Sequence, residues 1–310
     1  MQPSEFEIIR RYFERPAPSA LLGVGDDAAL VRLGEGMELA VSTDLLLEGR
    51  HFRPDADARK LGHKALAVNL SDMAAMGASP RWATLALGLP EADEAWIGSF
   101  ADGFFALAQR FGVELIGGDT TRGPRSICVC ILGEVPAGKA LRRSGARPGD
   151  DLWVSGRLGG AALGLLRPGN AEAARRLHEP EPRVALGELL RDRASAAIDV
   201  SDGFCQDLGH ILERSRCGAT VHYELLPKCA AFAGVQDVAL ERRCVLAGGD
   251  DYELVFSAPP AAREDIAKLA ASAGTDLARV GAIRAGEGLV VLDGEGREIA
   301  PPRGYDHFAP

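Results

Sequence analysis

Strand-like and helix-like segments alternate along this sequence, break at a polar stretch, and then alternate again. In the first half, strands are predicted at 38–42, 82–89, 114–118 and 127–133, and helices at 61–76 and 95–111. In the second half, strands are predicted at 152–155, 196–200, 252–257 and 288–292, and a helix at 203–214. The break at 142–151, RRSGARPGDD, combines charge with Gly and Pro, as domain linkers do. We therefore predict a mixed α/β protein of two domains, 1–141 and 142–310, each with a sheet packed by helices.

The charge and hydropathy of the chain exclude several classes of protein. Lysine and arginine number 35 and aspartate and glutamate 44, which gives a net charge of −9. An acidic chain without a basic block is a poor ligand for nucleic acid or anionic membranes. No apolar run reaches the length of about 18 residues that a membrane helix needs. The first residues predict an amphipathic helix with a capping box of Ser4 and Glu7 and no signal core, so we expect a cytoplasmic protein.

Six cysteines are spread through the chain without a CxxC pair. Cys128 and Cys130 alternate within the strand-like run SICVCILG and are expected to share one face of the sheet. This pattern favours buried, reduced thiols over a zinc or disulfide site.

Two glycine-rich segments resemble nucleotide-binding loops but fail in detail. Residues 133–139 have P-loop spacing, yet Ala140 replaces the Ser or Thr that reaches magnesium, and Pro136 removes an N–H from the cradle. Residues 23–28 fit the dinucleotide fingerprint, but they would turn two carboxylates toward a pyrophosphate. A nucleotide site in this chain is therefore expected to use another arrangement.

The most informative residues are acids in settings that rarely hold them. Five acidic segments flanked by glycine or small residues lie beside apolar runs: GDD at 25–27, STD at 42–44, GGDTT at 117–121, DVSDG at 199–203 and GGDDYE at 248–253. A sixth acid, Asp72, shares a face with Asn69 on a helix that is apolar nearly all round. A buried carboxylate is costly without compensation, and a cation is its natural partner.

These acids together indicate a magnesium site, although each acidic turn alone has an ordinary structural explanation as a cap or turn. Mg²⁺ prefers hard oxygen ligands and shares its shell with water and phosphate oxygens. The sequence has neither a DxDxDG loop nor an HExxH motif, which disfavours calcium and zinc. Carboxylate-bound magnesium suits phosphoryl transfer from ATP, and an acceptor that is already an anion needs no general base. We assign no residue as a catalytic base.

The motifs make this sequence similar to the thiamine-monophosphate kinase family. The resemblance covers nearly the whole chain in order, through GDDAAL at 25–30, STDLLLEGRHF at 42–52, KALAVNLSDMAAMGA at 64–78, GGDTTRG at 117–123, RSGARPGD at 143–150, AIDVSDG at 197–203, GGDDYEL at 248–254 and GYDHF at 304–308. It implies transfer of the γ-phosphoryl group of ATP to thiamine monophosphate, which gives thiamine diphosphate. It also implies a homodimer, with an N-terminal domain that binds ATP and metal and dimerises, and a C-terminal domain that completes the active site.

The resemblance also implies roles for individual residues. The expected magnesium ligands are Asp27, Ser42, Thr43, Asp44, Asp72, Asp119, Asp199 and Asp202. The expected ATP contacts are Gly118, Asp119, Arg143 and Ser201, and the residues expected near the thiamine phosphate are His51, Asp250 and Tyr305. Asp250 is a departure, because the family motif usually reads GGEDYEL; it acts on the substrate or merely shapes a turn.

Two other functions stay open from the sequence. One is an ATP-dependent ring closure like that of aminoimidazole-ribonucleotide synthetase, which the GYDHF and EGRHF segments disfavour. The other is a non-catalytic nucleotide-binding subunit, which has less need of the acids Asp44, Asp72 and Asp119.

Overall fold

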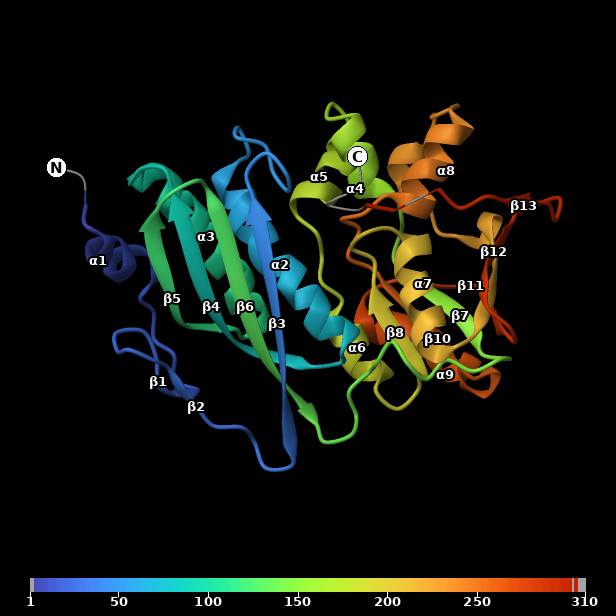
Figure 1. Cartoon of the computed structure of the whole chain (residues 1–310), viewed down its shortest axis with the longest axis horizontal. Helices are drawn as coiled ribbons and strands as arrows, with labels where there is room; N and C mark the ends of the chain where they lie inside the picture. Colours follow the sequence, from blue (N-terminus) through green and yellow to red (C-terminus); the bar gives the residue numbers. More distant parts are fainter. Residues whose placement is uncertain (1–2, 303, 306–310) are drawn as a thin grey trace. The chain divides into compact units, whose positions relative to one another are not determined.

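The computed structural model describes residues 3–302, 304 and 305, which form two compact units (Figure 1). The first unit comprises the chain up to Met73 and Ala78–Gly138, and the second comprises Ala74–Gly77 and the chain from Lys139 onward. Each unit holds a sheet packed with helices, which confirms the predicted mixed α/β class. The functional division at 1–141 and 142–310 stays a prediction.

Four strands form the main sheet of the first unit. In spatial order they are β3 (Met37–Leu47), β6 (Ser126–Pro136), β4 (Ser79–Leu89) and β5 (Glu114–Arg122). β4 and β5 run parallel, and the other neighbours are antiparallel. Helices α2 (Ala58–Ala75) and α3 (Glu94–Phe111) cover one face of this sheet (Figure 1). β3 and β5 are therefore its two edges.

Strand β3 shows two different faces, because successive side chains of a strand point to opposite sides. Leu46 is buried and Ser42 and Asp44 are half-buried on one side. The other side carries exposed apolar side chains, which we call the open face of β3: Met37, Leu39, Val41, Leu45 and Leu47. Val41 is the most exposed of them, at 56%.

The N-terminal segment forms a short helical layer in the first unit. The α-helix α1 (Glu5–Ile8) continues into the π-helix η1 (Ile9–Phe13). The Ser4 side chain accepts the N–H of Glu7, and the Glu7 carboxylate accepts the N–H of Ser4, which confirms the predicted capping box. A small hairpin of β1 (Ala20–Leu22) and β2 (Leu30–Val31) follows.

The second unit is built on a seven-stranded sheet. In spatial order its strands are β13 (Glu298–Ile299), β12 (Gly288–Leu292), β9 (Gly218–His222), β11 (Leu277–Arg284), β7 (Asp151–Ser155), β10 (Leu254–Ala258) and β8 (Ala196–Asp199). Its α-helices are α4 (Gly160–Leu166), α5 (Ala171–His178), α6 (Val184–Leu190), α7 (Phe204–Ser215), α8 (Val238–Ala247) and α9 (Arg263–Ala273). The core gathers apolar side chains from the sheet, α7 and α8, among them Phe204, Ile211 and Val255.

The predicted strands and helices are present, but two acidic segments differ from expectation. Asp44 and Asp119 lie inside β3 and β5 and not in turns after them, because both strands continue for several residues. Gly133 lies inside β6, so the segment with P-loop spacing is mostly strand. Among the described residues, no helix is both long and apolar enough to cross a membrane.

Candidate functional site

One group of predicted metal ligands lies where β3 faces α2. The hydroxyl of Ser42 donates a hydrogen bond of 2.5 Å to Oδ2 of Asp72. Asp44 is on the same side of β3 as Ser42, since it is two residues further along the strand. Thr43 lies between them and points to the open face, so its side chain is separated from the other two.

Asn69 adds an oxygen that the sequence predictions did not use as a ligand. It precedes Asp72 by three residues on α2 and is completely buried. Its Nδ2 donates to the carbonyl of Ala65 at 3.0 Å, and its Oδ1 has no partner within the described chain. Buried polar atoms are normally satisfied. Carboxylate, hydroxyl and amide oxygens on one helix–strand pair fit a hard divalent cation such as Mg²⁺.

A second group of predicted residues lines a cavity of about 650 Å³ in the first unit. Asp27 comes from the loop before β2, and Gly118 and Asp119 come from β5. Gly118 has φ +151°, and a Cβ there would lie 1.9 Å from the carbonyl oxygen of Leu85, so the close approach of β4 requires glycine. Gly118 and Asp119 are exposed, so the β5 backbone is accessible at this point of the cavity.

The rest of this cavity mixes apolar with polar and charged residues, and its apolar part was missed by the sequence predictions. Its walls include Phe6, Ile9, Phe13, Leu87 and Leu115. The first three come from the N-terminal helical segment, which the sequence predicted as an amphipathic helix. Amphipathic periodicity signals such a face but not what it covers. The cavity thus combines apolar residues and an accessible glycine backbone with Arg10 and five carboxylates, which belong to Glu5, Glu14, Asp26, Asp27 and Asp119.

The strand register separates the two groups. Asp44 pairs with Val129, Val129 pairs with Leu85, and Leu85 pairs with Gly118. Asp44 and Asp119 therefore lie at opposite edges of the sheet, three interstrand spacings or about 14 Å apart. Within the part of the chain that the structure describes, no three His, Cys, Asp or Glu side chains converge as a metal cluster. Metal binding by the full predicted ligand set stays a prediction.

In the second unit, the DVSDG segment forms a tight loop between β8 and α7. Asp207, on the first turn of α7, accepts hydrogen bonds from the backbone N–H groups of Ser201, Asp202 and Gly203 at 3.0 Å each. Burial and the neighbouring Asp199 raise the pKa of Asp207 to about 8, while the bonds from the loop oppose that rise. Sequence reasoning missed Asp207, although an acid on the apolar side of a predicted helix is the same signal that marked Asp72.

The GGDDYE segment packs against that loop. The N–H of Asp250 donates to the carbonyl of Ser201 at 2.9 Å, and the N–H of Tyr252 donates to that of Val200 at 2.8 Å. The Tyr252 hydroxyl donates to Oδ1 of Asp250 at 2.9 Å. Both residues are left-handed, with φ +65° and +50°. Backbone strain of this kind concentrates at functional sites, yet aspartate also tolerates this conformation in turns, so both explanations of Asp250 stand.

The other predicted site residues are Tyr305, Arg143 and His51, and their hydrogen bonds link them to different parts of the chain. The N–H of Tyr305 donates to the carbonyl of Asp202 at 3.0 Å, and Gln206 holds the Tyr305 carbonyl at 2.9 Å. The last three residues of the GYDHF motif lie outside the described residues. Arg143 is exposed, and its carbonyl accepts a bond from the Ser215 hydroxyl. His51 belongs to the first unit, where its Nδ1 accepts a bond of 2.9 Å from the N–H of Leu47.

Two further acids of the GGDDYE segment have structural roles. Asp251 accepts bonds from the N–H groups of Gly159 at 2.6 Å and Ala161 at 3.3 Å, at the start of α4. Burial raises the pKa of Asp251 to about 7. Glu253 is almost completely buried and receives two bonds of 2.6 Å from Arg183. These acids support the fold around Asp250.

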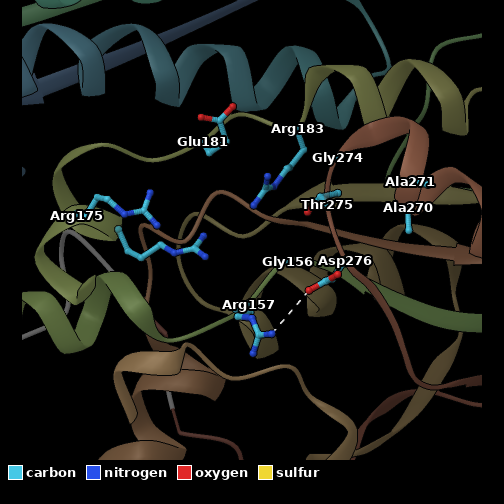
Figure 2. Close-up of a pocket in the computed structure, with 11 residues that line it drawn as sticks. Gly156, Arg157, Arg175, Glu181, Arg183, Ala270, Ala271, Gly274, Thr275 and Asp276 are labelled. Atoms are coloured by element: carbon cyan, nitrogen blue, oxygen red, sulfur yellow. Dashed lines mark ion pairs between the residues drawn. The ribbon is translucent and has the colours of Figure 1, made fainter. Parts of the chain in front are cut away.

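A hollow of about 500 Å³ beside Glu253 gathers four arginines, three of which Figure 2 labels. They are Arg157, Arg175, Arg176 and Arg183. Every one has a carboxylate partner: Arg183 and Arg176 share Glu253, Arg175 lies 3.3 Å from Glu172, and Arg157 lies 3.7 Å from Asp276. With Glu181, which also lines the hollow and interacts electrostatically with Arg183, four carboxylates offset the four guanidinium groups, so we interpret this hollow as an ion-pair network that braces Glu253.

Comparison with known proteins places the chain in a family. Residues 25–135 match the family described as AIR synthase related protein, N-terminal domain, and residues 147–294 match the corresponding C-terminal domain. A thiamine-monophosphate kinase of Salmonella typhimurium is 46% identical over 323 residues, which cover 100% of this chain and 99% of that protein.

Solved structures agree with this assignment. A thiamine-monophosphate kinase of Stenotrophomonas maltophilia has a TM-score of 0.85 and 47% identity, over 94% of this chain and 95% of that one. AaThiL, solved in complex with AMPPCP and TMP, has a TM-score of 0.77 and 29% identity, over 98% of this chain and 96% of that one. Full-length identity of this order, together with the shared fold and the ordered motifs, shows that the chain belongs to the thiamine-monophosphate kinase family.

Proposed function

We propose that this protein transfers the γ-phosphoryl group of ATP to thiamine monophosphate, with magnesium, to give thiamine diphosphate and ADP. The observation that carries the proposal is the hydrogen-bonded group in the second unit, where the loop of Asp199 and Asp202 is joined directly to Asp250 and Tyr305. Predicted metal ligands and predicted substrate contacts are thus parts of one backbone network. The family relatives support the same reaction, and AaThiL binds an ATP analogue together with TMP.

The cavity of the first unit supports ATP binding. Its apolar wall suits an adenine ring, and the exposed backbone at Gly118 lets phosphate oxygens come close. Asp27 and Asp119 would hold magnesium there, with Ser42, Asp44 and Asp72 as the second set of first-unit ligands. Magnesium would neutralise the charge of the phosphates during transfer.

The residues of the second unit would complete the site. Asp199 and Asp202 would hold magnesium, and Ser201 and Arg143 would bind phosphate oxygens, for which a guanidinium is well shaped. Asp250 would attract the cationic thiazolium of the substrate. Tyr305 and His51 would bound the thiamine phosphate site. Since the acceptor phosphate is already anionic, the chain needs to orient it and exclude water but not to remove a proton.

We also propose a homodimer that uses the open face of β3. Five alternate apolar side chains of this strand are exposed, which is unusual for a surface that meets only water. The same face on a second copy is self-complementary, as a twofold interface requires.

The compartment and the absence of other macromolecules are part of the proposal. A net charge of −9 disfavours binding to nucleic acid or anionic lipid. Thiamine monophosphate and ATP are small polar anions of the cytoplasm, where we expect the protein to act.

Phosphorus NMR of the protein with ATP, magnesium and thiamine monophosphate tests the reaction. We expect thiamine diphosphate and ADP in equal amounts. Formation of AMP, or product without ATP, would contradict the proposal. Single-turnover ATP cleavage with each acceptor separates the alternatives: cleavage only with the ring-closure substrate would indicate a cyclo-ligase, and none with any acceptor would indicate a binding subunit.

A further inference from the structure

One buried side chain fixes the backbone of the loop that joins predicted metal ligands to predicted substrate contacts. We propose that Asp207 is a positioning residue, which sets the geometry of residues 201–203 for magnesium and thiamine monophosphate. Its Oδ2 accepts three consecutive backbone N–H groups, from Ser201, Asp202 and Gly203, at 3.0 Å each. The identity of the ligands rests on the proposed function, whereas the geometry does not.

The contacts of Asp207 differ from ordinary helix capping. A capping side chain binds the first N–H groups inside its helix. Asp207 lies within α7, whose first residue is Phe204, and it binds the N–H groups of the three residues before the helix. Its target is therefore the loop. It is only 2% exposed, so water does not replace these bonds while the loop stays in place.

The direction of these N–H groups also determines where the loop carbonyls point. In a planar trans peptide the C=O of one residue and the N–H of the next point in opposite directions. Because the N–H of Asp202 points to Asp207, the carbonyl of Ser201 points away from it and accepts the N–H of Asp250 at 2.9 Å. Because the N–H of Gly203 points to Asp207, the carbonyl of Asp202 points away and accepts the N–H of Tyr305 at 3.0 Å.

Asp207 thus holds one side of a loop whose other side holds both predicted substrate residues. The far end of the loop has little freedom, because Gly203 has φ +122° and a Cβ there would lie 2.8 Å from the backbone of Ala247. Without Asp207, the N–H groups of buried Gly203 and half-buried Ser201 and Asp202 lose their acceptor, and the peptide planes of Ser201 and Asp202 can rotate. Rotation would move Asp250 and Tyr305 relative to Asp199.

The test compares three substitutions at this position with a matched control. Asp207→Ala removes the acceptor, Asp207→Asn keeps one acceptor oxygen without the charge, and Asp207→Glu keeps the charge but displaces the oxygens by about one bond length. The control is Asp293→Ala, since Asp293 accepts the N–H groups of Glu295 and Arg297 in the turn between β12 and β13. Amide hydrogen exchange of a peptide spanning 200–208 is measured first, on protein without ligand.

We expect exchange at 201–203 to be at least about tenfold faster in Asp207→Ala and little changed in Asp207→Asn and in the control. In kinetics, Asp207→Ala should raise both the KM for thiamine monophosphate and the magnesium concentration for half-maximal rate by about tenfold or more, with the KM for ATP within about threefold. In Asp207→Asn, the KM for thiamine monophosphate and the magnesium concentration for half-maximal rate should both stay close to their wild-type values. An increase of both constants in Asp207→Ala that is absent in Asp207→Asn would indicate positioning by the acceptor oxygen. The Asp293→Ala control shows how far a general loss of stability alone changes the same constants.

Several results would overturn the inference. Unchanged exchange in Asp207→Ala would show that the loop keeps its geometry without the carboxylate. Equal loss in Asp207→Asn and Asp207→Ala would show that charge matters and the acceptor does not. If Asp207→Ala fails to fold, Asp207→Glu takes its place, and normal exchange with normal kinetic constants there would equally contradict positioning. A wild-type protein with no kinase activity would reject the proposed function and leave the exchange result intact.

Discussion

The two units hold their acids in different ways. In the second unit, backbone hydrogen bonds link Asp207, the 201–203 loop, Asp250 and Tyr305 into one group. In the first unit, Asp44, Asp72 and Asp119 stand on regular elements and Asp27 lies in a loop, and the Ser42 hydroxyl donates directly to the Asp72 carboxylate. The second unit is therefore preorganised by its own chain, whereas the first presents separated carboxylates that bound ligands would have to connect.

The largest expected effect lies in the first unit. Asp44→Asn, Asp72→Asn and Asp119→Asn should each lower kcat by at least about 100-fold, because metal positioning by carboxylates is lost. Each variant should stay folded by circular dichroism, and its melting temperature without metal should equal or exceed that of the wild type, since like charges are removed. The control is Asp102→Asn, an exposed acid whose side chain is 71% accessible. Activity within about tenfold of wild type in all three would contradict the metal site.

In the second unit, removal of the buried acid Glu253 should lower the free energy of unfolding more than it lowers catalytic activity. Glu253→Ala leaves the guanidinium of Arg183 without its partner inside the protein, so the free energy of unfolding should fall by about 3–5 kcal/mol. Urea denaturation measures this change. Asp276→Ala removes an exposed partner of Arg157 and should change stability by less than about 1 kcal/mol. Equal changes in the free energy of unfolding for Glu253→Ala and Asp276→Ala would contradict the distinction between buried, ion-paired acids and solvent-exposed acids.

Asp250 tests whether the preorganised unit binds substrate or only forms a turn. Asp250→Asn and Asp250→Gly both tolerate the left-handed backbone but lack the charge. Both should raise the KM for thiamine monophosphate by about tenfold, with smaller changes in kcat and in the KM for ATP. Asp250→Glu, the residue usual in the family, should stay within a few-fold of wild type. An unchanged KM in Asp250→Asn would leave only the turn-forming role.

The smallest effect concerns thiols on the sheet of the first unit. Cys128 and Cys130 are half-buried, whereas the other four cysteines are buried. Burial raises the pKa of Cys205 to about 12, so its reactive thiolate is scarce at pH 8. Titration with DTNB should modify Cys128 and Cys130 before the other cysteines. Their modification should be slower at protein concentrations where light scattering gives twice the chain mass of 32.8 kDa. Scattering that gives one chain mass at micromolar concentration would contradict the dimer.

The same contrast explains what the sequence could predict. Local signals identified α1, where Ser4 and Glu7 cap the helix, and α2, where continuous apolar character showed burial. Cys128 and Cys130 share a face of β6, as alternation predicted. These features depend on residues within a few positions of each other.

The missed features depend on contacts between distant segments. Asp207 carried a local signal, as an acid on the apolar side of a predicted helix, but its link to the predicted substrate residues runs through Asp250 and Tyr305, which follow much later in the chain. The N-terminal side chains of the cavity were missed because a helix face does not reveal the strands that it covers. The strand ends at Asp44 and Asp119 were misplaced because small and acidic residues resemble turns, while pairing with β6 and β4 continues past them.

The open face of β3 has a consequence for the newly made chain. β3 is an eleven-residue edge strand that pairs with β6 on one side only, and its open edge and exposed apolar residues are a template for uncontrolled strand addition. Glu38 is an exposed charge on this strand and opposes such stacking. A fragment that ends at Gly138 would keep this hazard, so we expect it to aggregate during expression unless it finds another copy quickly.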